Sequence, residues 1–366
     1  MSEATPNPLP ALPRKAAAAL LTGGVTAACA LGLAALLLFL EGVDPSEVFL
    51  EILDGAFGSF TGLCLTLHAW VAVLIAVGGL LIAFAGRLWN IGMEGQICMG
   101  AIAAVGVMRA LDAAGSPPGV VVASALAAGV LGGAFWAALA GVLKTAAKVH
   151  EIFGGLGLNF IAMALAVWLV FGPWKRPGIG SMSGTEPFPD AFSLPTFPGT
   201  GLSPWTLAFG AVVFTLALVL LYRTRFGLRL RAVGINARAA DRLGLDSAFH
   251  LQASLALCGA AGGLLGALQV TVVHHKLIPA ISGGYGYQGL LVAILAAYRP
   301  LPALGAAFFF AAANVGAVRL PIVFQLDSTF AGVLTGAVVL TVMAGVGIRQ
   351  RRAERTPEPG GAVWTP

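Results

Sequence analysis

The 366-residue chain is very apolar: 58% of its residues are hydrophobic, only 10% are charged, and its mean hydropathy is +0.89. Soluble globular domains carry about 25% charged residues, so this composition excludes a soluble fold. It predicts an all-α polytopic membrane protein. The net charge of +5 does not indicate a nucleic-acid partner, because the basic residues lie in short connections between apolar runs.

The first apolar run, residues 16–40, follows Arg14 and Lys15 and is longer than the core of a signal peptide. We expect it to be retained as a first span behind a cytoplasmic N-terminal tail, residues 1–15. Other runs of about 20 apolar residues predict spans near 58–86, 92–111, 118–143, 152–173, 203–222, 248–271, 302–319 and 329–347.

The run at 287–298 is too short to cross a membrane unaided. It is a half-helix, a re-entrant segment or part of a longer tilted span. Including this run, we expect about ten transmembrane helices in a single membrane domain, residues 16–348.

Basic residues orient these spans. With the N-terminus inside, 16 of the 21 Lys and Arg residues lie at cytoplasmic ends, and the five at outer ends are Arg109, Lys175, Arg176, Lys276 and Arg319. Cytoplasmic loops carry such an excess of positive charge. Both termini are therefore expected in the cytoplasm, and the charged, Pro- and Gly-rich residues 349–366 are expected to form a disordered cytoplasmic tail.

Two connections are longer than the others. Residues 174–202 are rich in Pro and Gly without helical or strand periodicity, which predicts an ordered extracytoplasmic loop. Residues 223–247 are cytoplasmic by the charge count. There Asn236 is a good N-cap, residues 237–243 favour a helix, and Gly244 fits a helix stop. A short helix with nothing in its own loop to pack against predicts a protein partner.

A polar segment, Asn90-Ile91-Gly92-Met93-Glu94-Gly95-Gln96, interrupts two long apolar runs. Such a cluster costs several kcal/mol unless protein surrounds it or water reaches it, so it is a candidate functional site. We expect Asn90 to cap a helix that begins at Ile91, Gly92 and Gly95 to admit another backbone, and Arg87 to pair with Glu94. The segment is either a structural helix-to-helix turn or a direct contact to a substrate.

This segment resembles the signature of permease subunits of bacterial ATP-binding-cassette importers for nucleosides and simple sugars. It is most similar to the nucleoside or purine branch that works with basic-membrane-lipoprotein receptors. Weaker matches follow in order at 150–160, 232–240 and 284–293. The chain departs from the family at His150, where an Asn-like residue is expected, and at Gly154-Gly155, where threonines are common.

The resemblance implies one half of a translocation pore that works by alternating access in the bacterial cytoplasmic (inner) membrane. Its implied partners are a second, homologous but different permease, a cytoplasmic ATPase that binds ATP and Mg²⁺, and an extracytoplasmic lipoprotein or periplasmic receptor. The chain has no G-x-x-x-x-G-K-[ST] motif, so ATP hydrolysis belongs to a partner chain. We expect no enzyme activity and no catalytic, cofactor or metal site in this chain.

The match at 232–240 resembles the family's cytoplasmic coupling loop, which implies that residues 223–247 dock on the ATPase. In this coupling loop, small residues give a low-profile face and charged residues orient the partner. The predicted ATPase-coupling residues are Gly234, Asn236, Ala237, Arg238, Ala239, Ala240, Asp241, Arg242 and Gly244. A solvated loop helix is the alternative.

A neutral polar solute is bound by amides, hydroxyls and aromatic faces. The residues of this kind that are candidates for the substrate pathway are Asn159, Phe160, Tyr285, Tyr287, Gln288 and Asn314. For each of them, a helix–helix hydrogen bond or an interfacial aromatic is the alternative.

Other functions stay open at this point. Within the same superfamily, the chain could carry simple sugars or branched-chain amino acids. Outside it, an ion-coupled secondary transporter or a membrane enzyme is the rival. Both rivals predict more titratable groups within the spans than Glu94, Glu151 and His68.

Overall fold

The computed structural model describes residues 14–176, 178, 184–325 and six isolated residues beyond them (332, 336, 337, 341, 344 and 345). Every regular element in this part of the chain is a helix. Internal contacts group the chain into two compact units, Met1–Glu51 with Val318–Pro366, and Ile52–Ala317. The predicted span at 329–347, the tail at 349–366 and residues 1–13 of the N-terminal tail lie outside the continuously described residues.

The first unit contains α1 (Arg14–Leu40), the beginning of α2 (Pro45–Phe57) and α13 (Leu320–Val323). Helix α2 was not predicted, because Glu47, Glu51 and Asp54 interrupt its apolar pattern. It begins at a proline, which fits the first helical position. The Asp44 carboxylate just before it accepts a hydrogen bond from the Ser46 amide at 2.8 Å.

The second unit carries the remaining helices: α3 (Phe60–Ala85), α4 (Met93–Ala113), α5 (Pro118–Thr145), α6 (Glu151–Phe171), η1 (Asp190–Phe192), α7 (Pro204–Arg223), α8 (Arg225–Ile235), α9 (Ala237–Arg242), α10 (Ser247–Leu268), which continues as the π-helical turn η2 (Gln269–His274), α11 (Tyr285–Leu295) and α12 (Pro300–Ala317). Seven described helices are long and apolar enough to cross a membrane, or eight if residues 28–40 of α1 and α2 form one broken span. The chain is a multi-pass all-α protein, as predicted. Helix α11 has 11 residues, about 16 Å at 1.5 Å per residue, and is about half as long as a span requires.

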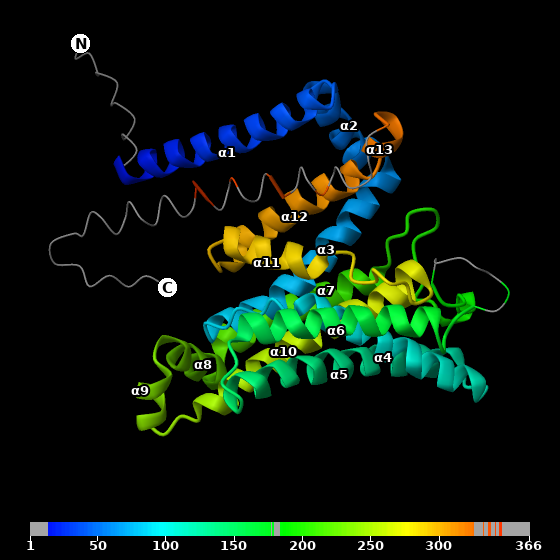
Figure 1. Cartoon of the computed structure of the whole chain (residues 1–366), viewed down its shortest axis with the longest axis vertical. Helices are drawn as coiled ribbons and strands as arrows, with labels where there is room; N and C mark the ends of the chain where they lie inside the picture. Colours follow the sequence, from blue (N-terminus) through cyan, green and yellow to red (C-terminus); the bar gives the residue numbers. More distant parts are fainter. Residues whose placement is uncertain are drawn as a thin grey trace, which may run out of the picture. The chain divides into compact units, whose positions relative to one another are not determined.

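Two helices form the centre of the second unit. The apolar windows of α3 and α10 are 83% and 78% buried, whereas those of α5, α6, α7 and α12 are 28–33% buried. In Figure 1, α4, α5, α6 and α10 run alongside one another, and α8 and α9 lie together at one end of them. Since every span is apolar, hydropathy alone does not distinguish a central helix from a peripheral one.

Glycines bring α4, α5 and α10 into backbone contact. Gly129 and Gly133 on α5, and Gly259 and Gly263 on α10, form two G-x-x-x-G pairs that face each other. A side chain on Gly263 would collide with the carbonyl oxygen of Gly129, and one on Gly100 of α4 would collide with Gly263. Small residues at this spacing let membrane helices approach closely enough for dispersion contacts to hold them together.

The described part of the predicted outer loop is ordered, as expected. Thr185 donates its amide to the Leu277 carbonyl at 2.9 Å, and the Leu277 amide returns a bond to the Thr185 hydroxyl at 3.0 Å. Further along, Leu194 donates to Thr271 at 2.9 Å, and the Ser193 hydroxyl bonds to His275 Nδ1 at 2.9 Å. The loop is therefore held by hydrogen bonds against η2 and the residues that follow it.

The glycine contact predicts a sharp stability difference between two glycine-to-alanine variants. Gly263→Ala should lower the midpoint of thermal unfolding in detergent, because overpacking a close helix contact costs about 1–3 kcal/mol. Gly157→Ala on α6 is the matched control, since a Cβ there meets nothing within 4 Å. Equal midpoints for the two variants would contradict close packing of α5 against α10.

Candidate functional site

The turn between α3 and α4 differs from the sequence prediction in two respects. Helix α3 ends at Ala85, and Arg87 follows with a left-handed backbone (φ 56°) and an exposed side chain. Helix α4 begins at Met93 rather than Ile91, and the residue at its N-cap is Gly92. The prediction that Asn90 caps this helix was therefore wrong: Asn90 lies two residues before the cap, and its side chain is used elsewhere.

Asn90 and Gln96 form a reciprocal amide pair. Asn90 Nδ2 donates to Gln96 Oε1 at 3.0 Å, and Gln96 Nε2 donates to Asn90 Oδ1 at 3.0 Å. Asn90 Nδ2 also lies 3.0 Å from the sulfur of Cys258 on α10. Both amides are buried, so the pair closes the turn onto α4 and holds it against α10.

Asn159 fastens the same segment to α6. Its Oδ1 accepts the Gly95 amide at 2.8 Å, and its Nδ2 donates to the Ile91 carbonyl at 2.8 Å. The predicted close approach at Gly92 and Gly95 is confirmed, with α6 as the partner. A Cβ on Gly155 would lie 2.9 Å from the Gly92 nitrogen. Gly155, a departure from the family's threonines, is therefore needed at this contact.

Glu94 caps a helix that lies 190 residues further along the chain. Its Oε1 accepts the Gly284 amide at 2.9 Å, and its Oε2 accepts the Gly286 amide at 2.8 Å. These amides belong to the start of α11, where unpaired N–H groups and the helix dipole favour a carboxylate. The side chain is 3% exposed. The described structure contains no ion pair between Glu94 and Arg87, so the predicted pairing was wrong.

The backbone before α11 is shaped for this contact. Gly283 and Gly284 adopt left-handed conformations, with φ of 57° and 77°, that side chains rarely tolerate. A Cβ on Gly286 would collide with the Glu94 carboxylate. The glycine-aromatic segment at 284–289 thus binds the Glu94 carboxylate through its backbone amides. It is also the start of the half-length helix α11.

Apart from Asn159, which holds the polar segment against α6, the predicted pathway residues separate into two groups. Tyr285 and Gln288 lie partly buried in the first turn of α11, beside the Glu94 cap, and Gln288 Oε1 is buried without a hydrogen-bond partner. Phe160, Tyr287 and Asn314 are exposed, with Phe160 at 63%. Sequence reasoning left out Thr206, whose buried hydroxyl also has no partner. A single threonine in an apolar run gives no signal of this.

The predicted coupling helix is present as α9. The Asn236 side chain accepts the Ala239 amide at 3.0 Å, and Gly244 stops the helix with a φ of 79°. Its exposed face differs from the predicted one, because Ala240 is 4% exposed and Gly234 lies against the end of α3, where a Cβ would be 2.5 Å from the Ala85 carbonyl oxygen. The exposed residues of this segment are Asn236, Arg238, Ala239, Asp241, Arg242, Leu243 and Gly244.

Asp241, which is also exposed, stabilises the end of this helix. The Asp241 carboxylate accepts the Ser247 amide and hydroxyl, both at 3.0 Å, and so ties the end of α9 to the start of α10. Leu243, which sequence reasoning left out, is 81% exposed.

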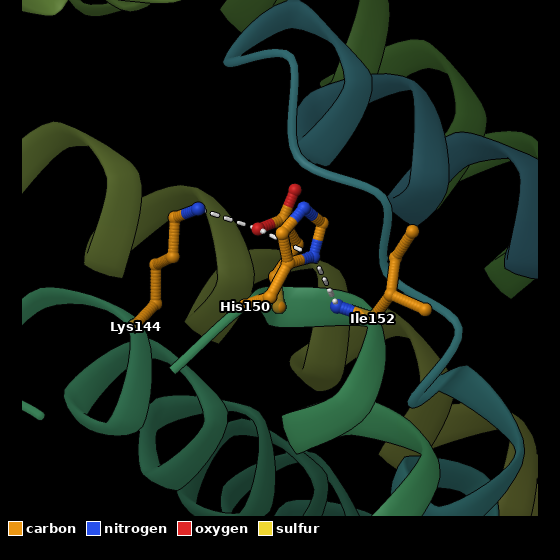
Figure 2. Close-up of polar contacts among 4 residues, drawn as sticks. Lys144, His150 and Ile152 are labelled. Atoms are coloured by element: carbon orange, nitrogen blue, oxygen red, sulfur yellow. Dashed lines mark hydrogen bonds and ion pairs between the residues drawn. The ribbon is translucent and has the colours of Figure 1, made fainter. Parts of the chain in front are cut away.

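A charged contact closes the turn between α5 and α6 (Figure 2). Lys144 Nζ lies 2.5 Å from Glu151 Oε2, and His150 Nδ1 lies 3.5 Å from the same oxygen. The Ile152 amide points at His150 Nδ1 at 3.4 Å. A ring nitrogen that accepts this amide does not also donate to Glu151. Lys144 is therefore the counter-ion, and the His150-Glu151 pair has a structural role in this turn.

Comparison with known proteins places the chain among transport permeases. Residues 62–343 match the family described as "Branched-chain amino acid transport system / permease component". The guanosine ABC transporter permease protein NupP of Bacillus subtilis is 26% identical over 329 residues, covering 87% of this chain and 92% of that protein.

Two further relatives carry different substrate names. The glucose ABC transporter permease protein TsgB13 of Haloferax volcanii is 29% identical over 351 residues, 90% of this chain and 89% of that protein. The nucleoside ABC transporter permease protein NupC of Lactococcus lactis is 29% identical over 282 residues, 74% of this chain and 87% of that protein.

The two hydrogen bonds of Asn159 predict that replacing it lowers the stability of the protein, even when no substrate is present. Asn159→Ala should lower the thermal unfolding midpoint of the solute-free protein, because each buried group left unpaired costs about 1–3 kcal/mol. Asn314→Ala, at an exposed position of α12, is the control and should leave the midpoint unchanged. If Asn159→Ala instead keeps its stability and weakens only solute affinity, Asn159 is a substrate contact.

Proposed function

Because the chain belongs to the family of branched-chain amino acid transport system permease components, we propose that it is a permease subunit of an ATP-driven importer for nucleosides or purine-like solutes. The observation that carries this proposal is the similarity, over most of the chain, to permeases named for guanosine and for nucleosides. Solute passes by alternating access, and the extracytoplasmic receptor supplies most of the binding affinity.

The α11 cap supports a neutral solute over an amino acid. Helix α11 is the one short apolar helix among the described residues, and half-helix N-termini in transporters commonly receive anionic groups of the substrate. Here the amides of Gly284 and Gly286 are already occupied by Glu94. A substrate carboxylate would find these donors taken and a negative charge beside them. Glucose is the second candidate, favoured by the similarity to TsgB13.

The exposed face of α9 supports an ATPase partner. Arg238, Ala239 and Leu243 project from a helix that is capped at both ends. Such a rigid helix transmits movement of a partner better than a flexible loop does. ATP and Mg²⁺ would bind to that partner. The other proposed partners are a second, different permease of the same family and an extracytoplasmic lipoprotein or periplasmic receptor.

The proposed setting is the bacterial cytoplasmic membrane, with about ten spans between residues 16 and 348. The excess of basic residues on one side supports cytoplasmic N- and C-terminal tails, 1–15 and 349–366. It also supports a cytoplasmic segment at 223–247 and an extracytoplasmic loop at 174–202. Such a chain is a membrane component, and hydrolysis takes place on its partner.

Uptake of labelled solutes tests this function directly. In cells that lack the native gene, the wild-type chain should restore uptake of guanosine but not of leucine, and uptake should stop when ATP is depleted. Leu243→Asp should reach the membrane normally yet reduce uptake at least about tenfold, because a charge replaces an apolar anchor at the partner face.

Three results would contradict the proposal. Restored leucine uptake would make the chain an amino-acid permease, and restored glucose uptake without guanosine uptake would make it a sugar permease. Uptake that follows the proton gradient and survives ATP depletion would indicate a secondary transporter.

A further inference from the structure

A cavity of about 350 Å³ opens beside the coupling helix, between α8 and the start of α10. Phe226 and Arg229 of α8 line one side, and Leu245, Asp246, Phe249 and His250 line the other. No residue of this cavity other than Gly244 belongs to the predicted coupling set. Its size is at the low end for ligand pockets.

The walls of this cavity are already ordered. The rings of Phe226 and His250 stack with centroids 5.5 Å apart, and Phe249 meets His250 edge-on at 5.4 Å. His250 Nδ1 donates to the Asp246 carbonyl at 2.7 Å, which holds the imidazole in place. An occupant would therefore meet a preformed site, and little ordering cost would oppose its binding.

The cavity and α9 form one continuous surface. The Leu245 amide bonds to the Ala240 carbonyl at 3.0 Å, and Ser247 bonds to the Asp241 carboxylate. These contacts fix the wall formed by residues 244–246 to the end of α9, and in Figure 1 α8 and α9 lie together at one end of the bundle. A partner docked on the exposed face of α9 would therefore lie next to the cavity.

The charge around the cavity selects the chemistry of its occupant. All six arginines between residues 223 and 242 are exposed. The two nearby acids are already engaged, Asp241 by Ser247 and Asp246 Oδ1 by the Phe249 amide at 2.9 Å. Among the lining residues Arg229 carries a positive charge and Asp246 a negative one. The excess of positive charge comes from the whole segment 223–247, where six arginines stand against two acids. Arg231, two residues on, lies over the Tyr222 ring at 5.5 Å and does not line the cavity.

We propose that this cavity is a second anchoring point for the ATPase, distinct from α9, and that it takes an acidic side chain of that partner. The carboxylate of the acidic residue pairs with Arg229, while its methylene groups pack on Phe226 and Phe249. Arginine beside aromatic rings in a small pocket is the composition of an interface hot spot. The inference rests on the proposed function, because it requires an ATPase partner.

Affinity measurements with matched charge reversals test the site. The full-length chain and its second permease are placed in phosphatidylcholine nanodiscs and titrated with the purified cognate ATPase. Arg229→Glu should weaken ATPase binding at least about tenfold, and the control Arg231→Glu should weaken it less than about threefold. The same ratio should hold in nanodiscs that contain phosphatidylglycerol.

Zero-length cross-linking identifies the acidic residue. An amine at position 229 (Arg229→Lys), treated with a carbodiimide, should form an amide bond to one Asp or Glu of the ATPase, with loss of water. The control Arg231→Lys should not. Changing that acid to lysine in the ATPase should restore binding to the Arg229→Glu permease.

Each adverse outcome has a separate meaning. If wild-type permease binds the ATPase and Arg229→Glu binds it equally well, the second anchor is overturned and the proposed function stands. If Arg229→Glu matters only in phosphatidylglycerol nanodiscs, the cavity is a lipid headgroup site and the inference is wrong. If the wild-type permease pair binds no ATPase, the proposed function itself is overturned.

Discussion

Two hydrogen bonds from one buried carboxylate to the start of a distant helix anchor the buried polar segment on which the packing of four helices depends. Glu94 joins α4 to α11 through the amides of Gly284 and Gly286. Asn159 and Asn90 join the adjacent turn to α6 and α10. In a lipid environment a polar group must be satisfied inside the protein. The polar segment at 90–96 therefore links four helices, α4, α6, α10 and α11, through hydrogen bonds that no apolar residue could make.

This arrangement separates three tasks along the chain. Glycines on α4, α5 and α10 allow the close backbone packing of these three helices. The polar segment at 90–96 fixes the positions of α6 and α11 relative to them. The exposed face of α9 and the adjoining cavity carry apolar and cationic groups at one end of the bundle. If the proposed ATPase docks there, rigid packing between these regions transmits its movement to the helices.

Features that depend on neighbouring residues could be predicted from the sequence. Contacts between residues far apart in the chain could not. The spans, the caps of α9 and the short α11 follow from apolar run length, Asn236 and Gly244, all of which act within a few residues. The partner of Glu94 lies 190 residues away, and a nearby arginine was the best guess available from spacing. The burial of Ala240 also depends on tertiary contact: on sequence alone, it looks the same as the exposed Ala239.

Hydrogen–deuterium exchange at the start of α11 tests the central claim most directly. Glu94→Gln should speed exchange in the peptide that contains residues 283–287 at least about tenfold, because a charge-assisted bond of about 1.5–3 kcal/mol is weakened. Arg87→Ala should leave that exchange unchanged, since Arg87 is exposed and contributes nothing to the cap. Equal effects from the two variants, or no effect from Glu94→Gln, would contradict the account.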